Sequence, residues 1–191
     1  MSIWVCGEVL IDLIPNGSGE RVPHVGGGPA NTAKALARLG HDVYFIDGIS
    51  SDKYGQMSRQ ELLDDEIKLD LALNSDKPTC LAIVSLNENG GASYEFEIDG
   101  TATFDFSLDW LPDPSRYKPQ VLHIGTLVTV IEPGADVLYD WAIRVAEFAP
   151  IVYDPNIRPS VMGDRDRYQA SVEKWAAISA VIKVSDDDVE W

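Results

Sequence analysis

Basic side chains are scarce in this sequence. Its 191 residues include 15 lysines and arginines against 31 aspartates and glutamates, which gives a formal net charge of −16. So acidic a surface repels nucleic-acid phosphates and anionic lipid headgroups, and no basic patch in the sequence offsets this repulsion. We therefore expect neither nucleic acid nor a membrane among the partners.

Long hydrophobic runs are also missing. The longest apolar stretch near the start, residues 3–14, is interrupted by Glu8 and Asp12 and is not preceded by basic residues. This pattern excludes a signal peptide or a membrane span in that stretch. A cytoplasmic location is the resulting expectation.

Cysteine and histidine are too few and too scattered to indicate a disulfide framework or a metal site. The two cysteines, Cys6 and Cys80, lie in apolar runs typical of strands, which favours reduced thiols in the core. No cysteine or carboxylate stands at metal-ligand spacing from the three histidines, so none of them is expected to bind a metal.

Short apolar runs typical of β-strands alternate with helical patterns along the chain. The predicted strands are residues 3–6, 43–49, 121–125, 151–154 and 180–184. One predicted helix begins near Pro29 and ends before Gly40. Two more are predicted over residues 134–148 and 167–178. This alternation predicts an α/β domain in which helices cover a parallel sheet.

Two further regions have the pattern of β-hairpins. In the first, turn residues 16–19 separate LIDLI from RVPHV; in the second, ENGG separates TCLAIVSL from ASYEFEI, with Gly90 and Gly91 supplying positive φ. These arms, within about residues 11–25 and 79–105, could form a small antiparallel sheet that acts as a lid over a cleft. Two separate surface hairpins are an equal alternative, and residues 111–119 are expected to form a loop back to the core.

The most distinctive local motif is GGGPAN, Gly26 to Asn31, at a predicted loop-to-helix junction. Glycine lets a ligand approach the backbone, and the start of a helix presents free N–H groups to a polar or anionic ligand. The alternative is a tight turn that only begins a helix. The motif matches neither the P-loop nor the G-x-G-x-x-G pattern, which weakens a dinucleotide-dependent oxidoreductase as a third interpretation.

Acidic residues interrupt the first apolar segment. Glu8 and Asp12 are four residues apart, so in one strand both would point to the same face. A sugar hydroxyl would suit such a carboxylate, because it can donate a charge-assisted hydrogen bond. A solvent-exposed face of the lid is the alternative.

Polar residues also follow two later predicted strands. Arg158, in DPNIRP at residues 154–159, would lie at the edge where open α/β sheets bind ligands, and it could stabilise a transferring phosphoryl group. The alternative is a turn in which Arg158 pairs with a carboxylate. Lys183, Ser185 and Asp188 follow the last strand, where a helix cap and a surface lysine explain them equally well.

Taken in order, GEVLIDLIP, GGGPANTAKALARLG, YEFEIDGTA, LHIGT, YDPNIRP and VIKVSDDDVEW resemble the PfkB or ribokinase-like carbohydrate kinases, especially the fructokinase type. The resemblance runs through residues 1–191. It implies a doubly wound, mostly parallel sheet with helices on both faces and a small antiparallel β lid. It also implies transfer of the γ-phosphoryl group of ATP to a sugar hydroxyl with Mg²⁺. Separately from the resemblance, an exposed lid sheet could pair with the lid of a second subunit in a homodimer; the alternative is an edge strand protected by the charges of Glu95 and Glu97.

The resemblance also implies roles for individual residues. Asp12, Gly27, Gly28 and Asn31 would bind sugar hydroxyls, and Arg158 would approach the phosphoryl group. Lys183, Ser185 and Asp188 would lie in the cofactor region, where Ser and Asp replace the Asn and Glu usual in the family. Aromatic side chains of the lid, namely Tyr94, Phe96 and Phe104, are candidates for an apolar wall, with plain packing as the alternative.

One family feature is absent. The second signature, D-x-x-G-A-G-D, which supplies the catalytic base, does not occur, and a short helix pattern after Ser185 stops at Trp191. We therefore expect an incomplete domain: the N-terminal, sugar-binding part of a sugar kinase. A non-catalytic sugar-binding or interaction module is the alternative, since this sequence offers no catalytic base.

Overall fold

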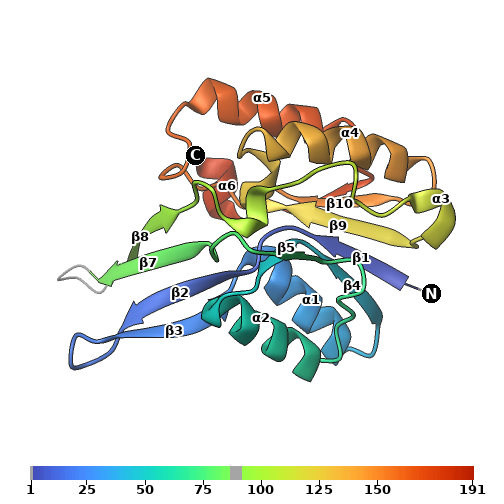
Figure 1. Cartoon of the computed structure of the whole chain (residues 1–191). Helices are drawn as coiled ribbons and strands as arrows, with labels where there is room; N and C mark the ends of the chain where they lie inside the picture. Colours follow the sequence, from blue (N-terminus) through green and yellow to red (C-terminus); the bar gives the residue numbers. More distant parts are fainter. Residues whose placement is uncertain (1, 87–91) are drawn as a thin grey trace.

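The computed structural model describes residues 2–86 and 92–191 (Figure 1). Its central sheet has five parallel strands in the order β11-β10-β9-β1-β4. Their bounds are β1 (Ser2–Cys6), β4 (Asp42–Ile46), β9 (Val121–Gly125), β10 (Ile151–Asp154) and β11 (Val181–Ile182). The predicted strand 43–49 is divided, because β4 ends at Ile46 and β5 (Gly48–Ser50) pairs with β6 (Leu73–Ser75) in a sheet of two strands.

Helices cover both faces of the central sheet. They are α1 (Gly28–Arg38), α2 (Lys53–Asp64), α3 (Pro114–Tyr117), α4 (Gly134–Ala146), α5 (Arg165–Ala176) and α6 (Asp186–Glu190), with 3₁₀ turns η1 (Ala102–Phe104) and η2 (Thr126–Thr129). Figure 1 shows α4 and α5 on one side of the sheet and α1 and α2 on the other. The three predicted helices are confirmed; α2 was not predicted, and α3 lies within the stretch 111–119 expected to be a loop.

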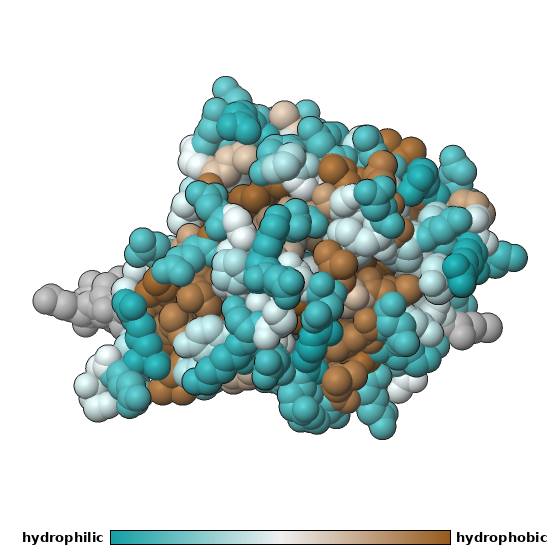
Figure 2. All heavy atoms as spheres, viewed as in Figure 1, coloured by the Kyte–Doolittle hydropathy of each residue, from teal (hydrophilic) through white to brown (hydrophobic). Residues whose placement is uncertain are grey.

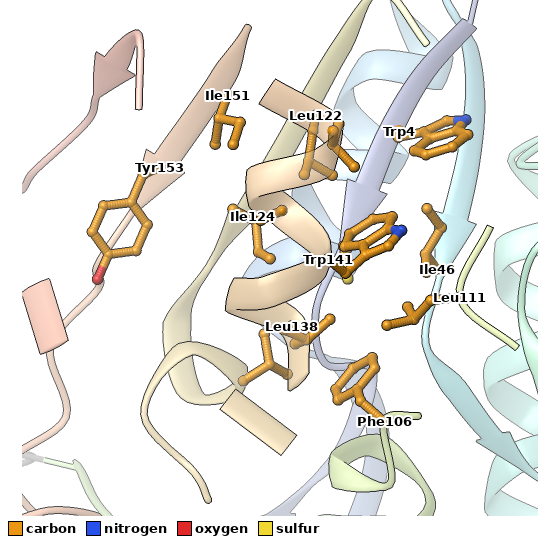
Figure 3. Packing of buried hydrophobic residues seen from close by; sticks show 14 of the residues in the cluster. Trp4, Ile46, Phe106, Leu111, Leu122, Ile124, Leu138, Trp141, Ile151 and Tyr153 are labelled. Atoms are coloured by element: carbon orange, nitrogen blue, oxygen red, sulfur yellow. The ribbon is translucent and has the colours of Figure 1, made fainter. Parts of the chain in front are cut away.

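The core has two parts because successive side chains of a strand point to opposite faces. Trp4 and Cys6 of β1 belong to the cluster under α4 and α5, whereas Val5 belongs to the cluster under α1. In the first cluster the rings of Trp4 and Trp141 stack at 5.9 Å with 9° between their planes (Figure 3). Both faces of the sheet are therefore covered by helices, as the resemblance implied, except at the edge strand β11, whose Val181 and Ile182 are exposed.

A second sheet has the strand order β3-β2-β7-β8, and we call it the lid sheet. It consists of β2 (Leu10–Pro15), β3 (Arg21–Gly26), β7 (Leu81–Leu86) and β8 (Ala92–Glu97). Both predicted hairpins are antiparallel, and a parallel pairing of β2 with β7 joins them. The hairpins are thus parts of one sheet, while the predicted turn at Gly90 and Gly91 lies outside the described residues.

The remaining sequence expectations concern cysteine and membranes. Cys6 and Cys80 are buried free thiols, as predicted. Among the helices of the described residues, none has the length and apolar character required to cross a membrane.

Candidate functional site

The site lies where the strand order of the central sheet reverses. β1 continues through α1 to β4 on one side, whereas the next strand of the sheet, β9, lies on the other side of β1. Loops that leave the carboxyl ends of two such strands diverge, and in open α/β sheets this leaves a crevice for a ligand. The backbone topology therefore places a binding site beyond Cys6 and Gly125.

A cavity of about 340 Å³ lies at this position. It is lined by all five residues that the sequence associated with sugar and phosphoryl binding, namely Asp12, Gly27, Gly28, Asn31 and Arg158. The structure thus brings together residues from β2, from the start of α1 and from the loop after β10.

Two glycines let the start of α1 approach its neighbours closely. Gly27 has φ 107°, and a Cβ atom there would collide with the carbonyl oxygen of Glu8. A Cβ on Gly28 would lie 2.8 Å from the Cγ2 atom of Thr126. The glycines thus allow close approach of other parts of the protein, and the loop that begins α1 forms one wall of the cavity. Close approach of a ligand to this backbone stays a prediction.

Asp12 occupies the lid side of the cavity. It lies on β2, directly opposite His24 of β3, and its side chain is half-buried. Burial raises the pKa of Asp12, and the nearby His24 opposes this shift. A partly desolvated carboxylate without its full set of hydrogen bonds is a strong acceptor for ligand hydroxyls.

Glu8 also lines the cavity, although the resemblance assigned it no role. The expectation that Glu8 and Asp12 share one strand is wrong, because Glu8 lies in the connection between β1 and β2. Its side chain is only 3% exposed. Burial raises the pKa of Glu8 to about 7, while a hydrogen bond from the Thr126 hydroxyl favours the charged form.

Four other residues of the cavity wall were not singled out from the sequence: the apolar Leu10 and Leu127, and the polar Thr126 and Asn156. Thr126 and Asn156 stand out by their backbone. Both have left-handed backbone conformations, with φ 62° and 40°, and such strain often persists at binding sites. Each follows the end of a strand of the central sheet, after LHIG in one case and YDP in the other. Their position after β9 and β10 was the available signal, since ligands bind at this edge.

Arg158 lines the cavity from the loop after β10. Its backbone N–H donates to the Tyr168 hydroxyl of α5 at 3.1 Å, and its guanidinium donates to the Ile157 carbonyl at 3.0 Å. The guanidinium makes no salt bridge within the described part of the chain. The predicted alternative, a turn with Arg158 paired to a carboxylate, is therefore not found.

Lys183, Ser185 and Asp188 form a separate group outside the cavity lining. Ser185 and Asp188 make a reciprocal capping box at the start of α6, and Asp188 also accepts the Ile157 N–H at 2.6 Å. Burial opposes ionisation of Asp188, but the hydrogen bonds from Ser185 and Ile157 lower its pKa. Lys183 pairs with Asp154 at 3.1 Å. These residues thus hold the loop that carries Arg158.

The predicted aromatic wall is present in part. Tyr94 and Phe96 of β8 line the cavity, and their rings stack at 6.2 Å. Phe104 is not part of this wall; it is packed in the core cluster of the central sheet, which is the alternative that the sequence left open.

These features define a class: a doubly wound α/β protein with a cavity at its switch point, beside a second, separate β-sheet. The chain belongs to the pfkB family of carbohydrate kinases, whose pattern residues 2–191 match.

Individual relatives support the assignment. The chain is 34% identical to a fructokinase of Rhizobium leguminosarum bv. trifolii over 99% of its length, and 27% identical to one of Klebsiella pneumoniae over 98%. It superposes with a TM-score of 0.91, at 25% identity and over 99% of its length, on a fructokinase from Xylella fastidiosa crystallised with ATP. The chain spans 59%, 61% and 59% of these three proteins, respectively.

Proposed function

We propose that this chain is the sugar-binding part of an ATP-dependent sugar kinase of the fructokinase type. The observation that carries the proposal is the single cavity that Asp12, Asn31, the Gly27–Gly28 backbone and Arg158 line together. Carboxylate and amide groups suit sugar hydroxyls, and a guanidinium suits phosphoryl oxygens. The arrangement orients a neutral, hydroxyl-rich acceptor between the lid and a phosphate-binding cation.

The chemistry expected of these residues is binding and positioning. Phosphoryl transfer depends mostly on alignment and on stabilisation of charge. Asp12 and Asn31 would fix the acceptor sugar, while Arg158 would offset negative charge on the transferring group. Tyr94 and Phe96 of the lid would limit access of water, which competes with the sugar as acceptor.

ATP and Mg²⁺ are the proposed cofactors. The described residues offer a group that suits the phosphates of ATP, but no cluster of side chains suited to hold Mg²⁺. The guanidinium of Arg158 suits phosphate oxygens. The two oxygens of Asp188 already accept hydrogen bonds from Ser185 and Ile157, so Asp188 would hold the phosphate-side loop in place. In the described ranges, no group of three or more His, Cys, Asp or Glu side chains is placed to hold a metal. Mg²⁺ would therefore be bound chiefly through the nucleotide, whose phosphates it neutralises.

Transfer to D-fructose tests the proposal. The purified chain is incubated with ATP, MgCl₂ and D-fructose, and ADP and fructose phosphate are measured; binding of D-fructose is measured separately by calorimetry. Sugar binding with phosphate transfer supports a kinase. Transfer by this chain would exclude the non-catalytic sugar-binding module. Sugar binding with little transfer agrees with both interpretations, because this sequence offers no catalytic base, and absence of sugar binding contradicts both.

Asp12→Ala identifies the sugar side of the cavity. We expect D12A to weaken D-fructose binding at least about tenfold, because one charge-assisted hydrogen bond contributes about 1.5 to 3 kcal/mol. The matched control is Asp140→Ala, which removes an exposed carboxylate on α4. An unchanged affinity in D12A, with circular dichroism confirming the fold, would remove Asp12 from the site.

Two expectations remain predictions from the sequence. One is the cytoplasmic location. The other is a homodimer through the lid sheet, in which Ile14 and Tyr94 are exposed. Figure 2 shows apolar side chains gathered on the surface over the strands of the lid sheet.

A further inference from the structure

Glu8 has an unusual position for an acidic residue. It lies at the end of β1, and the Thr126 hydroxyl, just after β9, donates to its Oε1 atom. The other carboxyl oxygen, Oε2, is buried and has no hydrogen-bond partner in the described residues. A buried acceptor without a donor is costly, and the cost is larger when the group is charged.

Glu8 nevertheless belongs to the lining of the cavity, so its buried carboxyl group lies next to the space that a ligand would occupy. Glu8 shares this lining with Asp12, Asn31 and Arg158. A bound sugar would bring several hydroxyl donors within this volume. One such hydroxyl would supply the donor that Oε2 lacks, as the Thr126 hydroxyl already does for Oε1.

Charged and titratable groups surround Glu8 on several sides. They are Cys6 on β1, Asp12 on β2, Asp47 between β4 and β5, Cys80 before β7, Arg158 after β10 and Tyr168 on α5. Burial raises the pKa of Cys6, of Asp47 and of Cys80 well above their usual ranges. Arg158 is the neighbouring cation that favours a charged Glu8.

We propose that Glu8 is a direct sugar-binding residue: its Oε2 atom accepts a hydrogen bond from a sugar hydroxyl, and the carboxyl group releases its proton to solvent when the sugar binds. This inference rests on the proposed function. It makes Glu8 the second carboxylate of the sugar site, besides Asp12, and it couples sugar binding to the release of a proton.

The coupling between proton release from Glu8 and sugar binding determines how the dissociation constant changes with pH. Burial raises the pKa of Glu8 to about 7 in the empty site, and a donated hydrogen bond favours the charged form, so binding lowers this pKa. Near pH 7, binding should release about half a proton per sugar. Between pH 6 and pH 8 the dissociation constant should fall about tenfold, as the binding-competent charged form becomes dominant.

The experiment is calorimetric titration of the full chain with D-fructose at pH 7 in phosphate and in Tris. The difference in apparent binding enthalpy between these buffers gives the number of protons released. Dissociation constants are then measured from pH 6 to pH 8. The variant is Glu8→Gln, which keeps an acceptor for the Thr126 hydroxyl but carries no titrating group.

A matched control distinguishes Glu8 from the nearest exposed imidazole. His24 lies opposite Asp12, so His24→Asn is measured in the same way. We expect H24N to release the same number of protons as the wild type. E8Q should release none near pH 7, and its dissociation constant should vary less than about twofold across the range.

The outcomes separate this inference from the proposed function. Sugar binding with the same proton release in E8Q, or with none in the wild type, overturns the role of Glu8 and leaves the sugar site standing. If the wild-type chain binds no D-fructose, the proposed function and this inference both fail. If E8Q does not fold, the wild-type pH profile decides, because a flat profile overturns the inference.

Discussion

At the scale of single residues, the cavity combines features that cost stability. Thr126 and Asn156 hold left-handed backbone conformations, and Glu8 is buried with one oxygen lacking a partner. Each feature costs about 1 to 3 kcal/mol of folding free energy. It persists only because favourable contacts around it offset this cost. All three residues line the same cavity, which concentrates these costs where a ligand can offset them.

The stability of the empty chain should therefore depend on the charge of Glu8. Burial raises the pKa of Glu8 to about 7 in the folded chain, above its value in the unfolded chain. The proton is retained more strongly in the folded state, so stability is full below the unfolded pKa and is lost as pH rises through 7. From pH 4 to pH 8 the wild type should lose about 3 kcal/mol of unfolding free energy relative to E8Q.

Urea unfolding of both proteins across this range provides the measurement. The comparison with E8Q removes the contributions of carboxyl groups that do not interact with Glu8, because they titrate alike in both proteins. The charge of Glu8 also raises the pKa of Asp47, so the coupling between these two groups is part of the measured difference. A difference between the two unfolding free energies that stays constant with pH would show that the pKa of Glu8 is the same in the folded and unfolded chain, and would contradict the raised pKa.

At the scale of elements, α6 illustrates how a short helix serves a neighbouring loop. Asp188 caps α6 together with Ser185, and the Ile157 N–H donates to its Oδ1 atom. The loop after β10 and the start of α6 therefore share one carboxylate. Removing it would leave a backbone donor and a helix end without partners.

Asp188→Ala should lower the unfolding free energy by about 2 kcal/mol, the sum expected for a lost cap and an unpaired donor. The control is Asp187→Ala in the same first turn, which removes an exposed carboxylate and should cost no more than about 0.5 kcal/mol. Hydrogen exchange at the Ile157 amide provides the local readout. Equal effects of D188A and D187A on stability and exchange would contradict the shared-carboxylate role.

Elements with a strong pattern could be predicted from the sequence, and elements set by tertiary contacts could not. Val121–Gly125 and Ile151–Asp154 were predicted with their observed bounds because short apolar runs end at glycine or a polar residue. The helix Lys53–Asp64 was not predicted, because the face that it buries has no apolar stripe. Its buried residues are Gly55, Ser58 and Leu62, of which only Leu62 is a large apolar residue. Its Asp52 cap, which accepts the Gly55 N–H, was the remaining signal.

The residues of the candidate site also fall into two groups: those that a local sequence motif predicts and those that only long-range contacts bring together. Asp12, Gly27, Gly28, Asn31 and Arg158 belong to motifs that recur in a recognisable family, and the structure places them around one cavity. Glu8 and Thr126 meet across 118 residues of sequence, so no local pattern predicts their contact. The parallel pairing of β2 with β7, which joins the two predicted hairpins, likewise depends on long-range contacts.

At the scale of the whole molecule, the two core clusters share the same strands. Trp4 and Val5 are consecutive residues of β1, yet they belong to clusters on opposite faces. Disruption of either cluster exposes one face of the central sheet and removes support from the other. We therefore expect cooperative unfolding, in which neither face separates from the sheet before the other.

A matched pair of substitutions tests this cooperativity. Val145→Ala alters the cluster under α4 and Val43→Ala the cluster under α1; both side chains are at most 1% exposed, and each change should cost about 2 kcal/mol. The tryptophans among the buried core residues, Trp4, Trp141 and Trp175, all lie in the first cluster, so their fluorescence reports on that face, whereas far-ultraviolet circular dichroism reports on helices of both faces. V43A should shift the fluorescence midpoint in urea as far as the dichroism midpoint, although it lies on the other side of the sheet. A fluorescence midpoint unmoved in V43A, with the dichroism transition split in two, would mean that the two faces unfold independently.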